Sequence, residues 1–126
     1  MEVRLIKIFA GDQQVTVELN QSQTADLIWN ALPVQHYVQK WGDEIYFAIP
    51  VESCEMDGRD VVDIGDVGYW PPGQALCLFF GFTPASTCGE IRPASPVNLV
   101  GRIKTEPTVL SQVNPGEPVR VERACP

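Results

Sequence analysis

The sequence is short of basic residues, with nine Lys and Arg against sixteen Asp and Glu and a net charge of −7. The basic residues occur singly, so no cluster of them could follow a phosphate backbone, and nucleic acid and membrane surfaces are not expected partners. No apolar run approaches the roughly 18 residues of a membrane span. Charges at Glu2, Arg4 and Lys7 interrupt the N-terminal segment, leaving no secretory signal. We therefore expect a cytoplasmic protein.

Cysteine and histidine are few and dispersed. Cys54, Cys77, Cys88 and Cys125 lack close spacing, which predicts reduced thiols rather than a disulfide framework. The lone His36 lies far along the sequence from every cysteine, so no metal site is predicted. The glycines do not have the spacing of a phosphate cradle, and we expect no nucleotide or other cofactor.

Catalytic patterns are also missing. Ser86 and Ser95 lack the G-x-S-x-G elbow of hydrolases, and His36 would have to act as the base for either. Cys77 lies in an apolar segment, where burial raises a thiol pKa and makes the thiol inert. The paired acidic residues, Asp43 with Glu44, Asp57 with Asp60 and Asp63 with Asp66, lie near turn glycines and are interpreted as solvated. The exception is Glu44, because strand alternation places it opposite the apolar face of its strand. No catalytic residue is assigned.

Period-2 alternation of apolar residues predicts that most of the chain forms strands. The segment 75–81 (ALCLFFG) is apolar throughout, which predicts a central strand covered on both faces. The other predicted strands are 3–9, 15–19, 45–49, 97–103 and 118–122. The first two of these form a hairpin through the turn Ala10-Gly11-Asp12.

Two short helices complete the predicted elements. Ser22 can cap a helix whose apolar residues recur at i, i+3, i+4 and i+7 from Ala25 to Leu32, and Pro33 ends it. Glu106-Pro107 begins a second helix, which ends near Val113. We therefore expect one domain over residues 1–126, mainly all-β, forming a closed barrel of about eight strands with two short helices over its open ends.

The segment from Gly65 to Ser86 is the best candidate for a site. It joins a rigid turn, Trp70-Pro71-Pro72-Gly73, to the apolar strand and then to a loop rich in Pro, Ser and Thr. Two prolines fix φ and Gly73 permits a positive φ, so Trp70 is presented in one orientation. We expect its ring to line a concave pocket and to stay partly accessible to solvent. The alternative is that Trp70 is a core residue.

The order of the elements, with the segments WGDEIYFAIPV, GDVGYWPPGQALCLFFG and SPVNLVGRI, resembles the cyclophilin-like family of small bacterial and archaeal proteins of unknown function. The resemblance covers nearly the whole chain. Leu76 to Phe80 is similar to the S-Q-F-F run of true cyclophilins, and Val97 to Gly101 is similar to their V-x-F-G strand. The resemblance implies a cyclophilin-like barrel.

The resemblance does not extend to the isomerase residues. Cyclophilins direct an arginine from an F-H-R segment at the proline nitrogen, whereas the corresponding strand here, 44–49, has no arginine. Losing one such donor costs about 3 kcal/mol, or about a hundredfold in rate. The Q-G-G-D and A-N-x-G-x-N-T segments are also absent. Isomerase activity is expected to be small, unless Arg92 supplies the missing donor from its loop.

We therefore expect binding rather than fast chemistry, with a small apolar molecule or an extended, proline-containing peptide as the partner. The residues predicted to form the site are Trp70, Tyr46 and Phe80 as walls, Thr83, Ser86 and Ser95 as donors, and Glu44 and Arg92. A weak or divergent prolyl isomerase is one alternative, and a structural or oligomerising domain is another. The sequence leaves the oligomeric state open.

Overall fold

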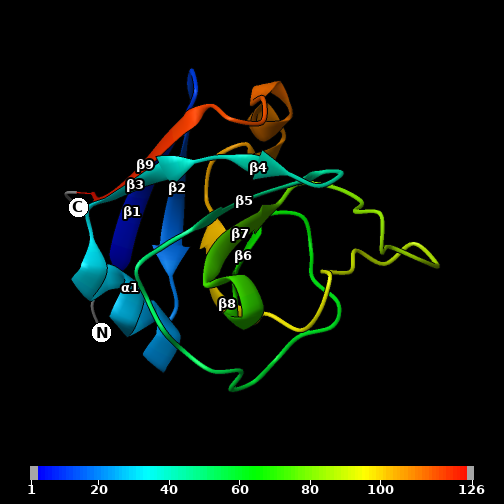
Figure 1. Ribbon diagram of the computed structural model, residues 1–126, viewed down its shortest axis with the longest axis horizontal. Coiled ribbons are helices and arrows are strands. Elements are labelled where there is room, and N and C mark those ends of the chain that lie inside the picture. Colours follow the sequence, from blue (N-terminus) through cyan, green and yellow to red (C-terminus); the bar gives the residue numbers. More distant parts are fainter. Residues whose placement is uncertain (1–2, 125–126) are drawn as a thin grey trace.

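The strands of the computed structural model, which describes residues 3–124, form one antiparallel sheet in the order β3-β9-β1-β2-β8-β6-β7-β5-β4 (Figure 1). The strands are β1 (Arg4–Ala10), β2 (Gln13–Leu19), β3 (Val34–Tyr37), β4 (Gln39–Lys40), β5 (Glu44–Ala48), β6 (Asp66–Trp70), β7 (Ala75–Phe79), β8 (Asn98–Ile103) and β9 (Pro118–Arg123). One α-helix, α1 (Gln23–Ala31), and two 3₁₀ turns, η1 (Pro71–Gly73) and η2 (Pro107–Gln112), complete this part of the chain. No helix among residues 3–124 is long and apolar enough to cross a membrane.

The sheet curls into a nearly closed barrel whose two edge strands belong to one chain segment. β3 pairs with β9, β4 pairs with β5, and the two are joined through Val38 alone. The bend at Val38 is itself paired, since its N–H donates to Glu117 O (2.9 Å) and its carbonyl accepts from Gly116 N (2.7 Å). Counted as one bent strand, β3 and β4 make an eight-stranded barrel, which confirms the prediction.

The barrel interior holds the main hydrophobic core. Alternate residues of β1 and β2, such as Ile6, Ile8, Val15 and Val17, are fully buried there. At the two ends, α1 contributes buried Ile28 and η2 contributes buried Leu110. Figure 1 shows these two elements at opposite ends of the barrel, where the sequence predicted helices.

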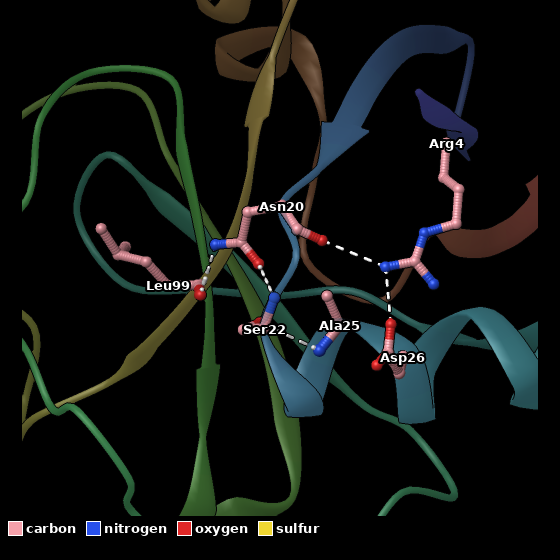
Figure 2. A network of polar contacts seen from close by, with 6 residues as sticks. All are labelled: Arg4, Asn20, Ser22, Ala25, Asp26 and Leu99. Carbon is pink, nitrogen blue, oxygen red and sulfur yellow. Dashed lines mark hydrogen bonds and ion pairs between the residues drawn. The ribbon is translucent and has the colours of Figure 1, made fainter. Parts of the chain in front are cut away.

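The start of α1 is tied to the barrel by a network of polar contacts (Figure 2). The Ser22 hydroxyl accepts from Ala25 N (3.2 Å), which confirms the predicted cap. The Asn20 side chain accepts from Ser22 N (3.0 Å) and donates to the carbonyl of Leu99 in β8 (2.8 Å). Arg4 of β1 forms an ion pair with Asp26 of the helix (2.7 Å) and donates to the backbone carbonyl of Asn20. The helix is thus held by two strands that are distant in the sequence.

A second, smaller core lies on the outer face of β5, β6 and β7. All five residues of β7 are buried, as predicted, because its alternate residues face the barrel interior and this outer layer. The outer layer is covered by residues of segments 49–65 and 80–97, which start at opposite ends of the β5–β7 pair and form the long loops below and to the right of these strands in Figure 1. These segments are joined by short bridges between Arg59 and Val97 and between Val62 and Ile91.

Three strands were not predicted. β6 follows the turn at Gly65 and is buried from Asp66 to Tyr69, without an exposed face to give an alternating pattern. β3 and β4 are short and largely exposed, so they carry few apolar residues. Their pairing depends on partners far along the chain, which local sequence does not reveal.

Candidate functional site

A cavity of about 260 Å³ lies on the outer face of the barrel, beneath the segment that joins β7 to β8. Its walls come from three strands and two loops. The lining residues are Trp41, Glu44, Tyr46, Trp70, Cys77, Pro93, Ala94 and Val97. Three of the eight are aromatic, and Glu44 is the charged residue among them.

Strand alternation explains how β5 and β7 supply this wall. Tyr46 lies directly across from Cys77 in the antiparallel pairing, so both side chains point to the same face. Their neighbours Ile45 and Phe47 point into the barrel interior. Trp41 is brought to the same face because its N–H donates to Glu44 O (2.9 Å), which extends the pairing of β4 with β5.

Trp70 is held rigidly at the end of β6. The indole Nε1–H donates to the Ser95 hydroxyl (2.6 Å), which ties the ring to the covering loop. A Cβ at Gly73 would lie 2.7 Å from the ring, so only glycine lets η1 fold back against it. The ring is half-buried and lines the cavity together with Tyr46. The predicted location of these two residues is therefore the observed one.

Glu44 is unusual because its carboxyl is buried and one of its oxygens, Oε1, lacks a hydrogen-bond partner among the described residues. The residue is 4 % exposed. Burial raises the pKa of Glu44 from 4.5 to about 7, and a hydrogen bond with Cys77 lowers it in part. Burial, the negative charge of Glu44 and that same hydrogen bond raise the pKa of the Cys77 thiol. Near neutral pH the thiol is protonated and the carboxyl exists in both forms.

The prediction that Phe80 forms a wall is wrong. Phe80 belongs to the interior core, and the ammonium of Lys40 lies 5.9 Å from its ring centre. The reason is the alternation along β7, since Phe80 continues the inward positions of Leu76 and Leu78. Cys77, an outward position of the same strand, lines the cavity instead.

Thr83 and Ser86 do not line the cavity; they hold the covering loop together. The Ser86 hydroxyl accepts from Thr83 N (2.9 Å) and from Arg92 N (3.2 Å). The Thr83 hydroxyl donates to Arg92 O (2.5 Å). The hydroxyls of Thr83 and Ser86, predicted as donors to a ligand, instead form hydrogen bonds within the covering loop. The Ser95 hydroxyl accepts from the Trp70 indole and so fixes one wall of the cavity.

Arg92 is likewise absent from the lining, although Pro93 and Ala94, which follow it, are present. Its guanidinium forms an ion pair with Glu90 (2.7 Å), and its Nε is buried without a partner within residues 3–124. The guanidinium therefore pairs with Glu90 of its own loop and does not point into the cavity lining.

Five lining residues were not predicted: Trp41, Cys77, Pro93, Ala94 and Val97. Alternation from Tyr46 would have identified Cys77 once β5 and β7 were paired. Trp41 had a weaker signal as an aromatic residue before the turn at Gly42. The three loop residues had none.

No group of three or more His, Cys, Asp and Glu residues within residues 3–124 could hold a metal ion. Cys54, Cys77 and Cys88 are free thiols, and Cys125 lies outside the described residues.

The fold and cavity define a small antiparallel barrel protein with an aromatic-lined cavity outside its wall. A family model described as Cyclophilin-like matches residues 4–122, and the chain belongs to this family. It is also similar to the solution structure of the hypothetical protein AF2241 from Archaeoglobus fulgidus, with 46% sequence identity and a TM-score of 0.83. That match covers 98% of this chain and 95% of the other. No curated protein matches the chain.

Proposed function

We propose that the protein binds a small, largely apolar ligand or a proline-containing segment in the cavity. The observation that carries the proposal is the convergence of Trp41, Tyr46 and Trp70 on one cavity of about 260 Å³. Ligand sites are typically concave and mostly apolar with a few polar groups, at about 300–1,000 Å³. The cavity is slightly smaller than that range, which suits one small molecule or one prolyl ring.

Preorganisation supports the same proposal. The Trp70 ring is fixed by η1, by Gly73 and by the hydrogen bond to Ser95, so a ligand does not have to order it. Rigid walls reduce the entropy cost of binding. An aromatic residue that served only the core would not require this arrangement at the surface.

The proposal is tested by NMR titration with two neutral probes, 3,3-dimethylbutan-1-ol and N-acetylproline methylamide. We expect saturable shifts of the indole N–H signals of Trp41 and Trp70, with no shift at Trp29, which lies on α1. Trp70→Ala should abolish binding of both probes. Tyr37→Ala is the matched control, because Tyr37 is an exposed aromatic outside this cavity. Flat titrations with both probes would favour a structural or oligomerising domain instead.

Stability separates a wall residue from a core residue at adjacent positions. Trp70 is half-buried, so Trp70→Ala should lower the free energy of unfolding by less than about 2 kcal/mol. Tyr69 is fully buried and donates to Val51 O, so Tyr69→Ala should cost about 3–5 kcal/mol. Chemical denaturation of both variants gives the comparison. Equal losses would mean that Trp70 belongs to the core.

Efficient prolyl isomerisation is not part of the proposal. β5 reads Glu-Ile-Tyr-Phe-Ala without an arginine, and the guanidinium of Arg92 pairs with Glu90. We expect acceleration of cis/trans exchange in an Xaa-Pro peptide to be about a hundredfold below that of an enzyme with the donor in place. A protease-coupled assay measures it. A cyclophilin-like rate would contradict this expectation, and its loss in Arg92→Ala would identify the substitute donor.

A further inference from the structure

We infer that the ligand of this cavity carries a positively charged nitrogen, an organic ammonium, which is bound by the Glu44 carboxylate and the surrounding aromatic rings. The inference rests on the proposed function and specifies the class of ligand. It is carried by two features of the described residues: a buried carboxyl oxygen without a partner, and three aromatic residues lining the same cavity.

A buried carboxyl oxygen without a hydrogen bond is costly, and native proteins rarely leave one uncompensated. Glu44 is 4 % exposed, lines the cavity, and has no partner for Oε1 within residues 3–124. A cationic ligand would supply the missing partner. A charge-assisted contact is also stronger than one with a neutral donor.

The aromatic walls favour a cation over a neutral donor. Trp and Tyr rings carry a negative face that attracts ammonium groups, and aromatic cages recognise quaternary ammonium in this way. Trp41, Tyr46 and Trp70 supply three such rings to the cavity that Glu44 also lines. The net charge of −7 also attracts cations toward the molecule.

Lys40 in the neighbouring strand and Arg92 in the covering loop pair with groups other than Glu44. Lys40 lies opposite Ile45, on the other face of the strand pair, and its ammonium donates to two backbone carbonyls at the end of η2 (3.1 and 3.0 Å). The guanidinium of Arg92 pairs with Glu90. Within the described residues, no lysine or arginine lines the cavity. The ionised carboxylate therefore has no protein counter-ion there.

Three other titratable residues lie beside Glu44 on its strand or in its cavity, Asp43, Tyr46 and Cys77, and none of them supplies a positive charge. The Cys77 thiol stays protonated, because burial and the charge of Glu44 raise its pKa. The Asp43 carboxylate belongs to an exposed residue and lies against Gly81, away from the lining residues. The acidic group that a ligand meets in the cavity is thus Glu44.

A matched pair of probes isolates the charge. Choline and 3,3-dimethylbutan-1-ol have the same shape and differ in whether the central atom is a charged nitrogen or a carbon. At pH 8 and constant ionic strength, NMR titration should give choline at least a tenfold lower Kd. Glu44→Gln should remove this advantage, so that the two probes bind with similar Kd. Asp43→Asn is the control, because it removes the adjacent carboxylate while leaving the advantage intact.

A pH series tests the same contact without a variant. Choline keeps its charge at every pH, so its affinity follows the ionisation of Glu44, whose pKa is about 7. From pH 8 to pH 6 the Kd of choline should rise about tenfold, while that of the alcohol stays constant. In Glu44→Gln the choline curve should be flat.

The outcomes separate the two proposals. If the alcohol binds and choline binds no better, the inference of an ammonium ligand is wrong and the binding function stands. If neither probe shifts the cavity signals, both proposals fail. A choline advantage that does not change between pH 8 and pH 6 would also overturn the assignment to Glu44, even where Glu44→Gln fails to fold.

Discussion

At the scale of single residues, the buried carboxyl of Glu44 makes the free energy of unfolding depend on pH. Its pKa is raised from 4.5 to about 7 in the folded protein, mainly by burial. Between these two values the folded state holds a proton that the unfolded state has released. The free energy of unfolding must therefore fall as the pH rises from about 4.5 to about 7, since the unfolded state binds fewer protons there.

The matching prediction concerns Glu44→Gln. At pH 8, a pKa shift of this size lowers the free energy of unfolding of the wild type by about 3 kcal/mol, compared with a protein whose carboxyl had the ordinary pKa. The variant should lack this loss, so the difference between the two proteins should grow from pH 5 to pH 8. Denaturation curves at pH 5, 6, 7 and 8 measure the difference. Parallel pH profiles would contradict the raised pKa.

Residue by residue, the sequence predicted the cavity where the signal was local. The two prolines after Trp70 predict a rigid turn whatever lies around it, although the positive φ expected at Gly73 is found at Gln74 (48°). Alternation along 44–49 correctly put Glu44 and Tyr46 on one face. Phe80 failed because the apolar run 75–81 shows no alternation, so nothing in it tells inward from outward positions. Thr83 and Ser86 failed because a hydroxyl in a loop serves the backbone of the loop as readily as a ligand.

At the scale of elements, β6 lets the covering segment pack closely against the outer face of the barrel. Gly68 of β6 lies across from Cys77 on the outward face. A Cβ there would lie 2.8 Å from Cγ2 of Val97, a lining residue of the cavity. The absence of a side chain at Gly68 thus allows the loop to approach the sheet.

We therefore predict that Gly68→Ala displaces Val97 and disturbs the cavity. The clash should lower the free energy of unfolding by about 1–3 kcal/mol, as overpacking does, and weaken the binding of 3,3-dimethylbutan-1-ol. Denaturation and NMR titration of the same sample test both effects. Unchanged stability together with unchanged probe affinity would show that the two segments are not closely packed there.

Elements that depend on neighbouring residues could be predicted from the sequence, whereas those that depend on distant segments could not. The starts of α1 and η2 could be predicted from Ser22 and Pro107, since a helix start is determined by neighbouring residues. β6 could not be recognised, because its inward residues are covered by the barrel core and its outward residues by segments 49–65 and 80–97, and both are brought together only in the folded chain.

For the whole molecule, the predicted barrel follows from the alternating strands, but its closure depends on the bend at Val38. The sequence of segment 34–40 does not predict that its first half, β3, pairs with β9 while its second half, β4, pairs with β5 at the opposite edge of the sheet. The pairing is a property of the completed barrel.

The two-sided wall of β5 and β7 has a consequence for how such a protein can change during evolution. Ile45, Phe47 and Leu76 maintain the barrel from inside, while Glu44 and Cys77 occupy alternate positions that face the cavity. Selection for a new ligand can act on the outward set and leave the inward set in place. Related barrels can thus evolve to bind different ligands by substitutions at alternate residues of two strands, while the residues that stabilise the fold stay the same.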